Sequence, residues 1–93
     1  AVTNASIISR ADRQGVIVYV NENFERISGY AAEELIGQTH RIINSGYHQP
    51  AFWKTMWKTI VSGNMWRQEV RNRSKDGRYY WVDTFIMPIR EPD

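Results

Sequence analysis

The stretch from Met65 to Ile89 constrains the fold most, because it carries the two-residue period of a β-hairpin. A first strand, MWRQEVRNR, is followed by the turn residues SKDG and by a second strand, RYYWVDTFIMPI. Charged side chains occupy alternate positions of the first strand, so they share one face and are expected to point to solvent. These residues are Arg67, Glu69, Arg71 and Arg73. The opposite face is therefore expected to look into the protein.

This inward face combines apolar side chains with two amides. It carries Trp66, Gln68, Val70 and Asn72. A buried amide without a hydrogen-bond partner costs about 1–3 kcal/mol, so polar groups are needed opposite Gln68 and Asn72. Loop backbone or a buried water would satisfy them, and so would a ligand with heteroatoms held against the sheet. The sequence leaves both explanations open.

The second strand of the hairpin is apolar on both faces, which a sheet with one face in water would not show. One face carries Tyr80, Val82, Thr84 and Ile86, and the other carries Tyr79, Trp81, Phe85, Met87 and Ile89. Helices of this chain can cover one of these faces. The other face predicts contact with a flanking helix or with the partner in a homodimer, and Trp81, Phe85 and Met87 are the predicted contact residues.

The composition bounds what the chain can be. Residues 1–93 predict a single domain with one hydrophobic core. There is no Cys, which excludes disulfides, thiolate nucleophiles and Cys metal sites. No run approaches ~20 apolar residues and no export signal is evident, so we expect a cytoplasmic domain without direct membrane contact. The net charge is only +2 and its cations are scattered, so no nucleic-acid partner is expected.

Catalysis is not predicted either. The sequence shows no nucleophile with a base at suitable spacing, no paired carboxylates on one element and no phosphate-binding glycine loop. Neither His40 nor His48 has a spacing that indicates a metal site. An enzyme is therefore the least expected class.

The N-terminal part predicts a second hairpin and a capped helix. Strands are expected at residues 5–10 and 16–20, joined by a tight turn with Gly15 at its end. Asn21 is a suitable N-cap for the helix ENFERIS, because its side chain can accept from free backbone N–H groups. Gly29 is expected to end that helix in a left-handed conformation.

Three further helical segments are expected before the long hairpin. The short helix AAEELIG should turn Leu35 and Ile36 inward, and residues 39–46 predict one helical turn. A longer helix should begin at Pro50. Its apolar stripe is expected to face the core and contains Phe52, Trp53, Met56, Trp57, Ile60 and Val61. Strands that bracket helices in this order predict an α+β fold, with an antiparallel sheet and helices on one face.

Together these segments resemble the PAS family of sensory domains over residues 5–90. The resemblance rests on motifs that agree in order: the strand-to-helix step Val20–Asn21, SGY at 28–30, EEL and IG within 33–37, and KDG followed by YW and a late Pro88. It implies that the helices enclose a pocket against the sheet. It also implies a sensory input domain of a bacterial signalling protein, which relays its signal to an effector domain of the same polypeptide. A histidine kinase, a chemoreceptor and a diguanylate cyclase are examples of such proteins.

Within the family, the hairpin Trp residues and the turn NRSKDG are most similar to the flavin-type domains of aerotaxis transducers and nitrogen-fixation redox regulators, which hold FAD. The resemblance implies that Arg41 binds a phosphate and that Asn44 and Asn72 contact the edge of the flavin ring. The predicted cofactor site is completed by Trp57, Trp66 and Gln68.

Two alternatives to a flavin stay open. A haem would need an axial ligand, and His40 and His48 are the two imidazoles of the chain. A ligand-free domain would act purely as a dimerisation module, with Trp57 and Trp66 filling the space between helices and sheet. His40 stands where light-sensing flavin members carry a reactive Cys. The resemblance therefore implies redox sensing without a blue-light adduct.

The C-terminus departs from the family pattern. Family members continue into a fifth strand at the centre of the sheet, whereas this chain stops at Asp93. We expect a C-terminally truncated domain that lacks this strand. Its hairpins would then pair directly, or a neighbouring chain would fill the gap, or the piece is incomplete.

Overall fold

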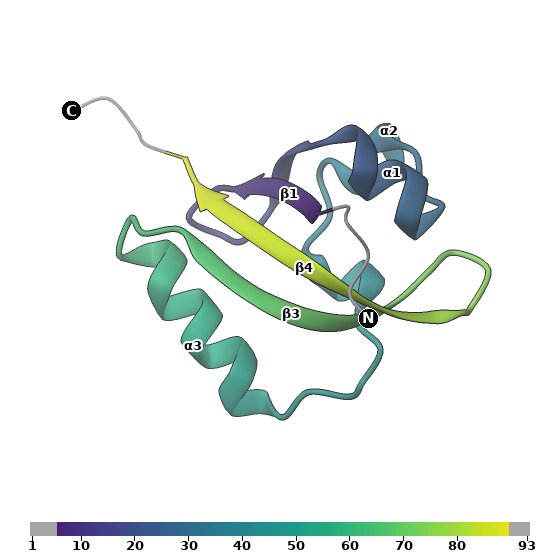
Figure 1. Ribbon diagram of the computed structural model, residues 1–93. Helices are drawn as coiled ribbons and strands as arrows, with labels where there is room; N and C mark the ends of the chain where they lie inside the picture. The colour runs from purple at the N-terminus through teal and green to yellow at the C-terminus, as the bar shows by residue number, and fades with distance from the viewer. Residues whose placement is uncertain (1–5, 90–93) are drawn as a thin grey trace.

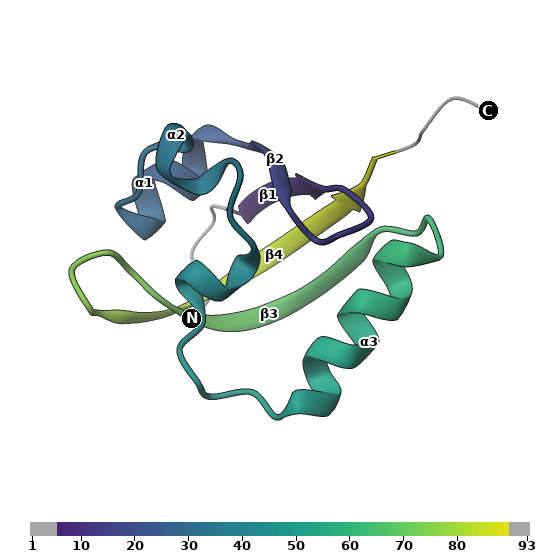
Figure 2. The ribbon, with the colours of Figure 1, turned by 180° about the vertical axis from the view of Figure 1, so that it is seen from behind.

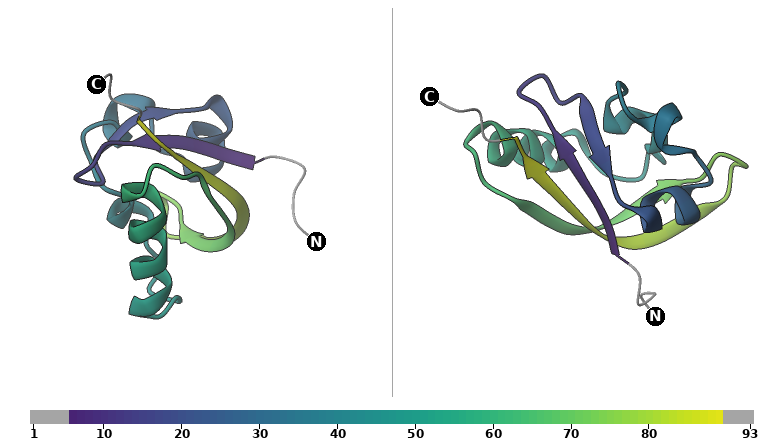
Figure 3. Two further views of the ribbon diagram at one scale, coloured as in Figure 1. Left: turned by 90° about the vertical axis from the view of Figure 1, so that its left-hand side faces the viewer. Right: turned by 90° about the horizontal axis from the view of Figure 1, so that it is seen from above.

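The computed structural model describes residues 6–89, which form a four-stranded sheet with the helices on one face (Figures 1 and 3). The elements are β1 (Ser6–Ala11), β2 (Ile17–Val20), α1 (Glu22–Ser28), α2 (Ala32–Leu35), the 3-10 turn η1 (His40–Ile43), α3 (Pro50–Val61), β3 (Trp66–Arg73) and β4 (Tyr79–Pro88). The element order confirms the sequence-based prediction. The first residue of the predicted strand 5–10 and the C-terminal Asp93 lie outside the described residues.

The two hairpins pair directly with each other. The strand order is β2-β1-β4-β3, and each hairpin is antiparallel within itself. Between the hairpins, β1 and β4 run parallel, from Ser6 opposite Asp83 to Ala11 opposite Pro88. The sheet is therefore mixed, which differs from the antiparallel sheet expected, because the inner strands of both hairpins run in the same direction.

The long hairpin presents the two faces that its alternation predicts. Val70, Val82 and Ile86 are buried on the inner face. On the outer face the guanidinium of Arg67 donates to both carboxylate oxygens of Asp83, at 3.1 and 2.9 Å. The period of two thus assigns the faces correctly, but Gln68 on the inner face is exposed.

Asn21 connects the first helix to the first strand. Its Oδ1 accepts from the backbone N–H of Phe24, at 3.1 Å, and of Ile8, at 3.0 Å, while its Nδ2 donates to the carbonyl of Ser6. The predicted N-cap is confirmed. Gly29 ends α1 with φ 80°, as expected for a left-handed C-cap.

Two clusters of buried side chains form the core. The first lies beneath α1, α2 and η1 and contains Ile7, Ile17, Val20, Phe24, Leu35, Ile43 and Val82. The second lies beneath α3 and contains Ala11, Ile60, Trp66, Val70 and Ile86. Figure 2 shows α1 and α2 grouped over one part of the sheet and α3 lying along β3. The helices thus divide into two groups over one sheet.

Besides Gln68, three apolar residues expected to point inward are exposed, namely Ile36, Trp57 and Val61. Ile36 is 46% exposed because α2 ends at Leu35 and the backbone of Ile36 is extended. Val61 is 51% exposed at the last turn of α3. Within residues 6–89, none of the helices has the length and apolar character that a membrane span requires.

Replacing Asn21 by Ala should lower the free energy of unfolding by about 2–3 kcal/mol. The change removes an N-cap worth about 1 kcal/mol and two further hydrogen bonds of similar size. Urea unfolding measures the difference. Asn64→Ala, in an exposed turn, is the control and should change stability by less than about 0.5 kcal/mol. Equal effects of the two changes would contradict the role assigned to Asn21.

Candidate ligand-binding site

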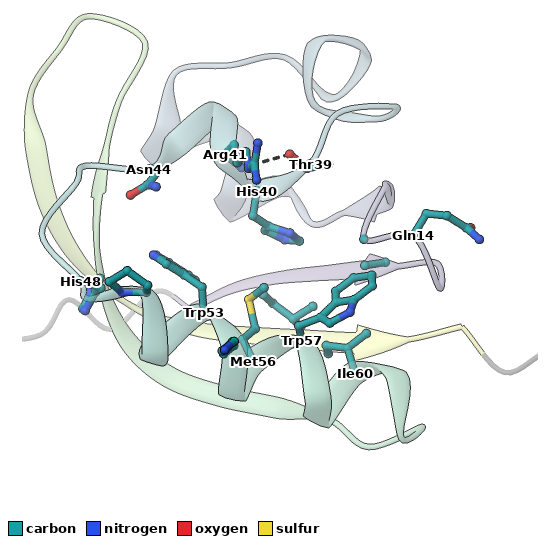
Figure 4. Close-up of a pocket in the computed structure, with 15 residues that line it drawn as sticks. Gln14, Thr39, His40, Arg41, Asn44, His48, Trp53, Met56, Trp57 and Ile60 are labelled. Atoms are coloured by element: carbon teal, nitrogen blue, oxygen red, sulfur yellow. Dashed lines mark hydrogen bonds between the residues drawn. The ribbon is translucent and has the colours of Figure 1, made fainter.

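A pocket of about 710 Å³ lies between η1 and α3, above β1 and β4 (Figure 4). Its lining residues are Ala11, Gln14, Gly15, Thr39, His40, Arg41, Asn44, His48, Pro50, Trp53, Lys54, Met56, Trp57, Ile60 and Ile86. The volume lies within the roughly 300–1,000 Å³ typical of small-molecule sites. The chain therefore has room for a ligand where the helices meet the inner face of the sheet.

Helix α3 supplies the apolar wall of this pocket. Trp53, Met56, Trp57 and Ile60 lie three or four residues apart, so they share one face of the helix. Trp57 closes the wall at the β1–β2 turn, where a Cβ on Gly15 would lie only 2.7 Å from the indole. The helix begins with Pro50 at its first position, as predicted. The predicted apolar stripe thus lines a pocket as well as a core.

His40 reaches into the pocket from η1 (Figure 4). Its Nε2 lies 2.9 Å from the hydroxyl oxygen of Ser9, which is fully buried in β1. Burial of the imidazole lowers the pKa of His40 to about 4, so the ring is neutral at pH 7. The neutral ring can both donate and accept one hydrogen bond.

The loop after η1 is held against the edge strand by two side chains. Ser45 donates its hydroxyl to the carbonyl of Arg71, and Nε2 of His48 accepts from the backbone N–H of Arg71 at 3.0 Å. The imidazole of His48 also stacks on Phe52, with ring centroids 4.0 Å apart. Burial lowers the pKa of His48, which keeps this nitrogen available as an acceptor. The pocket is bounded by a fixed loop at this end.

The charged residues of the lining are all basic. Arg41 from η1 and Lys54 from α3 are exposed at the pocket, and no carboxylate occurs among the lining residues of the described chain. An anionic group on a ligand is therefore favoured at this surface.

Three of the predicted cofactor residues lie at the pocket, namely Arg41, Asn44 and Trp57. Asn72 lies next to it, because its backbone forms an isolated bridge with Asn44. Asn72 is only 2% exposed, and its Nδ2 has no hydrogen-bond partner within residues 6–89. The alternation of β3 predicts that Asn72 faces inward, and its burial confirms that position.

Two other predicted cofactor residues are not at the pocket. Trp66 is buried in the core, where its ring lies edge-on to Phe52 and tilted against Trp53. Gln68 is exposed, because β3 is the edge strand of the sheet, and its side chain lies in a shallow recess with Arg67, Glu69 and Asp83. The expectation that Gln68 is a buried amide is wrong.

Sequence reasoning also missed part of the lining. Trp53 and Met56 carried a signal, since they belong to the apolar stripe of α3, but they were assigned to the core. Gly15 was expected as a turn residue, and nothing local indicates that an indole packs on it. Lys54 has no distinguishing signal in the sequence.

Protonation of His40 should destabilise the fold at low pH. Its pKa falls from 6.5 to about 4 on folding, so the stability that depends on the neutral ring is complete above pH 6.5 and is lost as the pH falls towards 4. The loss should be about 3 kcal/mol. The measurement is urea unfolding of wild type and His40→Gln between pH 7 and 4. The difference between them should change with pH, and a constant difference would contradict this assignment.

Two known proteins are similar to this chain over most of the chain's 93 residues. The aerotaxis receptor of Escherichia coli K12 is 34% identical over 86 residues, covering 92% of this chain and 17% of the receptor. The nitrogen fixation regulatory protein of Klebsiella oxytoca is 34% identical over 92 residues, covering 98% of this chain and 19% of that protein. The chain therefore spans less than a fifth of these relatives.

A solved structure and a protein-family model also match this chain. The structure of an RNA-binding light-oxygen-voltage receptor superposes with a TM-score of 0.70 at 30% identity, over 82% of this chain and 22% of that one. The family model described as the PAS fold matches residues 17–93. A sheet with helices around a pocket, the ordered motifs and these matches lead to one conclusion: the chain belongs to the PAS family of sensory domains.

Proposed function

We propose that residues 1–93 form the sensory input domain of a larger signalling protein and that the pocket binds a flavin, with FAD as the first candidate. The observation that carries the proposal is the unpartnered Nδ2 of Asn72, buried beside a pocket whose charged lining is basic. Relatives named as an aerotaxis receptor and a nitrogen fixation regulator support redox or oxygen sensing.

The residues present fit a flavin. Asn44 and Asn72 offer amide donors, which suit the carbonyl oxygens at the edge of the ring. Arg41 offers a guanidinium, which suits a phosphate. Trp53, Met56 and Trp57 offer apolar surface to the flat ring. The neutral His40 adds a hydrogen-bonding group without a charge.

A bound flavin would supply reversible electron uptake, coupled to protonation at the ring. The part played by the chain is the response of its amides. Asn72 is paired with Tyr80 in the neighbouring strand, and Trp81 follows on the outer face. A reorientation of the Asn72 amide would therefore shift the long hairpin and its outer face, to which a cytoplasmic effector such as a histidine kinase or diguanylate cyclase would respond.

Haem is the less favoured cofactor. A haem ligand must offer a free nitrogen lone pair. The Nε2 atoms of His40 and His48 are already engaged, with Ser9 and with the backbone N–H of Arg71. Binding a haem iron through either Nε2 would break a hydrogen bond that positions the pocket.

The exposed outer face favours a second function, homodimerisation. Trp81 is 45% exposed and Tyr79 is 53% exposed, while Phe85 and Met87 are half-buried. The guanidinium of Arg67 covers the ring of Phe85 at 4.7 Å from its centroid. Large aromatic side chains at the surface are typical of contact surfaces.

Replacing Asn72 by Leu separates the ligand role from a structural one. Without ligand the variant should be as stable as wild type or up to about 2 kcal/mol more stable, because a buried unpartnered donor is removed. Its affinity for FAD should fall about tenfold or more. Titration of purified protein with FAD, followed by visible absorbance and by the melting temperature, measures both effects. Gln68→Leu, at the exposed amide, is the control and should keep wild-type affinity.

Two outcomes would end the flavin proposal. One is a wild-type chain that takes up no FAD and keeps its melting temperature in excess FAD. The other is an Asn72→Leu variant that loses stability and keeps its affinity, because the amide would then be a structural group.

Trp81→Glu should shift the chain from dimer to monomer in sedimentation equilibrium, because it places a charge in the proposed contact. The dissociation constant should rise at least tenfold. Lys58→Glu, an exposed change on α3, is the control. The dimer proposal would be wrong if the wild-type chain stayed monomeric over a roughly 100-fold range of protein concentration.

A further inference from the structure

Two buried polar atoms lie side by side on the inner face of the sheet without a hydrogen bond. They are Nδ2 of Asn72 and the hydroxyl of Tyr80, and neither has a partner within the described part of the chain. Asn72 and Tyr80 are direct partners in the β3–β4 ladder, so their side chains leave the sheet on the same face. Leaving a buried hydroxyl or amide unpaired costs about 1–3 kcal/mol each. A pair of such groups at one place indicates a shared missing partner.

The surroundings show what kind of partner is missing. Tyr80 packs against the core cluster together with Tyr30 and Ile42, so its ring is fixed. Burial raises the pKa of Tyr80 to about 12, which keeps the phenol protonated at physiological pH. The amide nitrogen of Asn72 is a donor only. The hydroxyl of Tyr80 can donate or accept, and the amide of Asn72 lies close enough to offset part of the rise in its pKa. An oxygen acceptor within reach of both groups would accept a hydrogen bond from each.

The position of this pair relates it to the pocket. The backbone of Asn72 bridges that of Asn44, and Asn44 lines the pocket. Neither Asn72 nor Tyr80 lines the pocket itself: Asn72 lies beside a lining residue, and Tyr80 packs against the first core cluster. A flat ligand that enters between η1 and α3 would bring its leading edge to the Asn44 end of the pocket.

We propose that Tyr80 is a ligand-binding residue and that its hydroxyl, together with Nδ2 of Asn72, binds one carbonyl oxygen at the leading edge of the ligand ring. The inference rests on the proposed flavin function and adds a residue that sequence reasoning assigned only to the apolar inner face. The recognised group is a hydrogen-bond acceptor on a planar ring.

Tyr80→Phe tests this proposal with a change of one oxygen atom. FAD should bind the variant about tenfold more weakly than it binds the wild-type chain, and the visible bands of the bound flavin should shift, because one hydrogen bond to the ring is lost. Tyr79→Phe is the matched control: its ring is next in sequence, but its side chain is exposed on the outer face. That variant should retain wild-type affinity and spectrum.

The double variant Asn72→Leu, Tyr80→Phe tests whether both groups bind the same atom. If they do, the double variant should bind FAD no more than about twofold more weakly than the weaker of the two single variants. If the loss of FAD affinity in the double variant equals the product of the two single losses, the two groups bind different acceptors. That result would reject the shared site.

Ligand-free stability gives a readout that does not need flavin. Tyr80→Phe should raise the melting temperature of the ligand-free chain by a few degrees, because the unpartnered hydroxyl is removed. A lower melting temperature would overturn the proposal, since the hydroxyl would then already have a partner such as a buried water. If Tyr80→Phe is more stable but no variant, nor the wild type, takes up FAD, the flavin function fails while the acceptor site is supported.

Discussion

The parallel pairing of β1 with β4 is the interaction on which the rest of the structure depends. An isolated two-stranded hairpin is marginally stable, and this pairing joins two of them into one sheet. It brings Ala11 and Ile86, from opposite ends of the chain, to one floor beneath α3. It also places the buried hydroxyl of Ser9 where His40 can reach it. The pocket lies between these two joined strands and the helical segments η1 and α3 above them.

A small domain that contains a pocket leaves its helices incompletely packed. On α3, Ile60 is buried, whereas Trp53 and Met56 are half-buried and Trp57 is exposed at the pocket. The helix is anchored by aromatic contacts at its start, where Phe52 lies against Trp66. A ligand that covers the open indole and thioether would add the apolar burial that the chain alone does not achieve. A ligand in this pocket would therefore also stabilise the fold.

The polar groups of the inner face connect the pocket with the outer face of the sheet. Asn72 and Tyr80 are opposite each other in the ladder, and the next residue of β4 is the exposed Trp81. The edges of Tyr47 and His48 also meet the ring of Trp81, so the loop beside the pocket contacts the same surface. A change in hydrogen bonding at the pocket thus has a short physical route to the surface where a partner is expected.

Local patterns in the sequence determined the element order, the hairpin faces, the Asn21 cap and the Pro50 start of α3. Each of these features depends on neighbours within a few residues. Tertiary structure decided which side chains of a face meet the pocket. The period of two places Gln68 and Asn72 on the same face, yet the open edge of the sheet exposes Gln68, and the loop carrying Asn44 covers Asn72. It also decided the parallel β1–β4 pairing and the contact of Trp57 with Gly15, because both join segments more than forty residues apart, and no local period or propensity encodes such contacts.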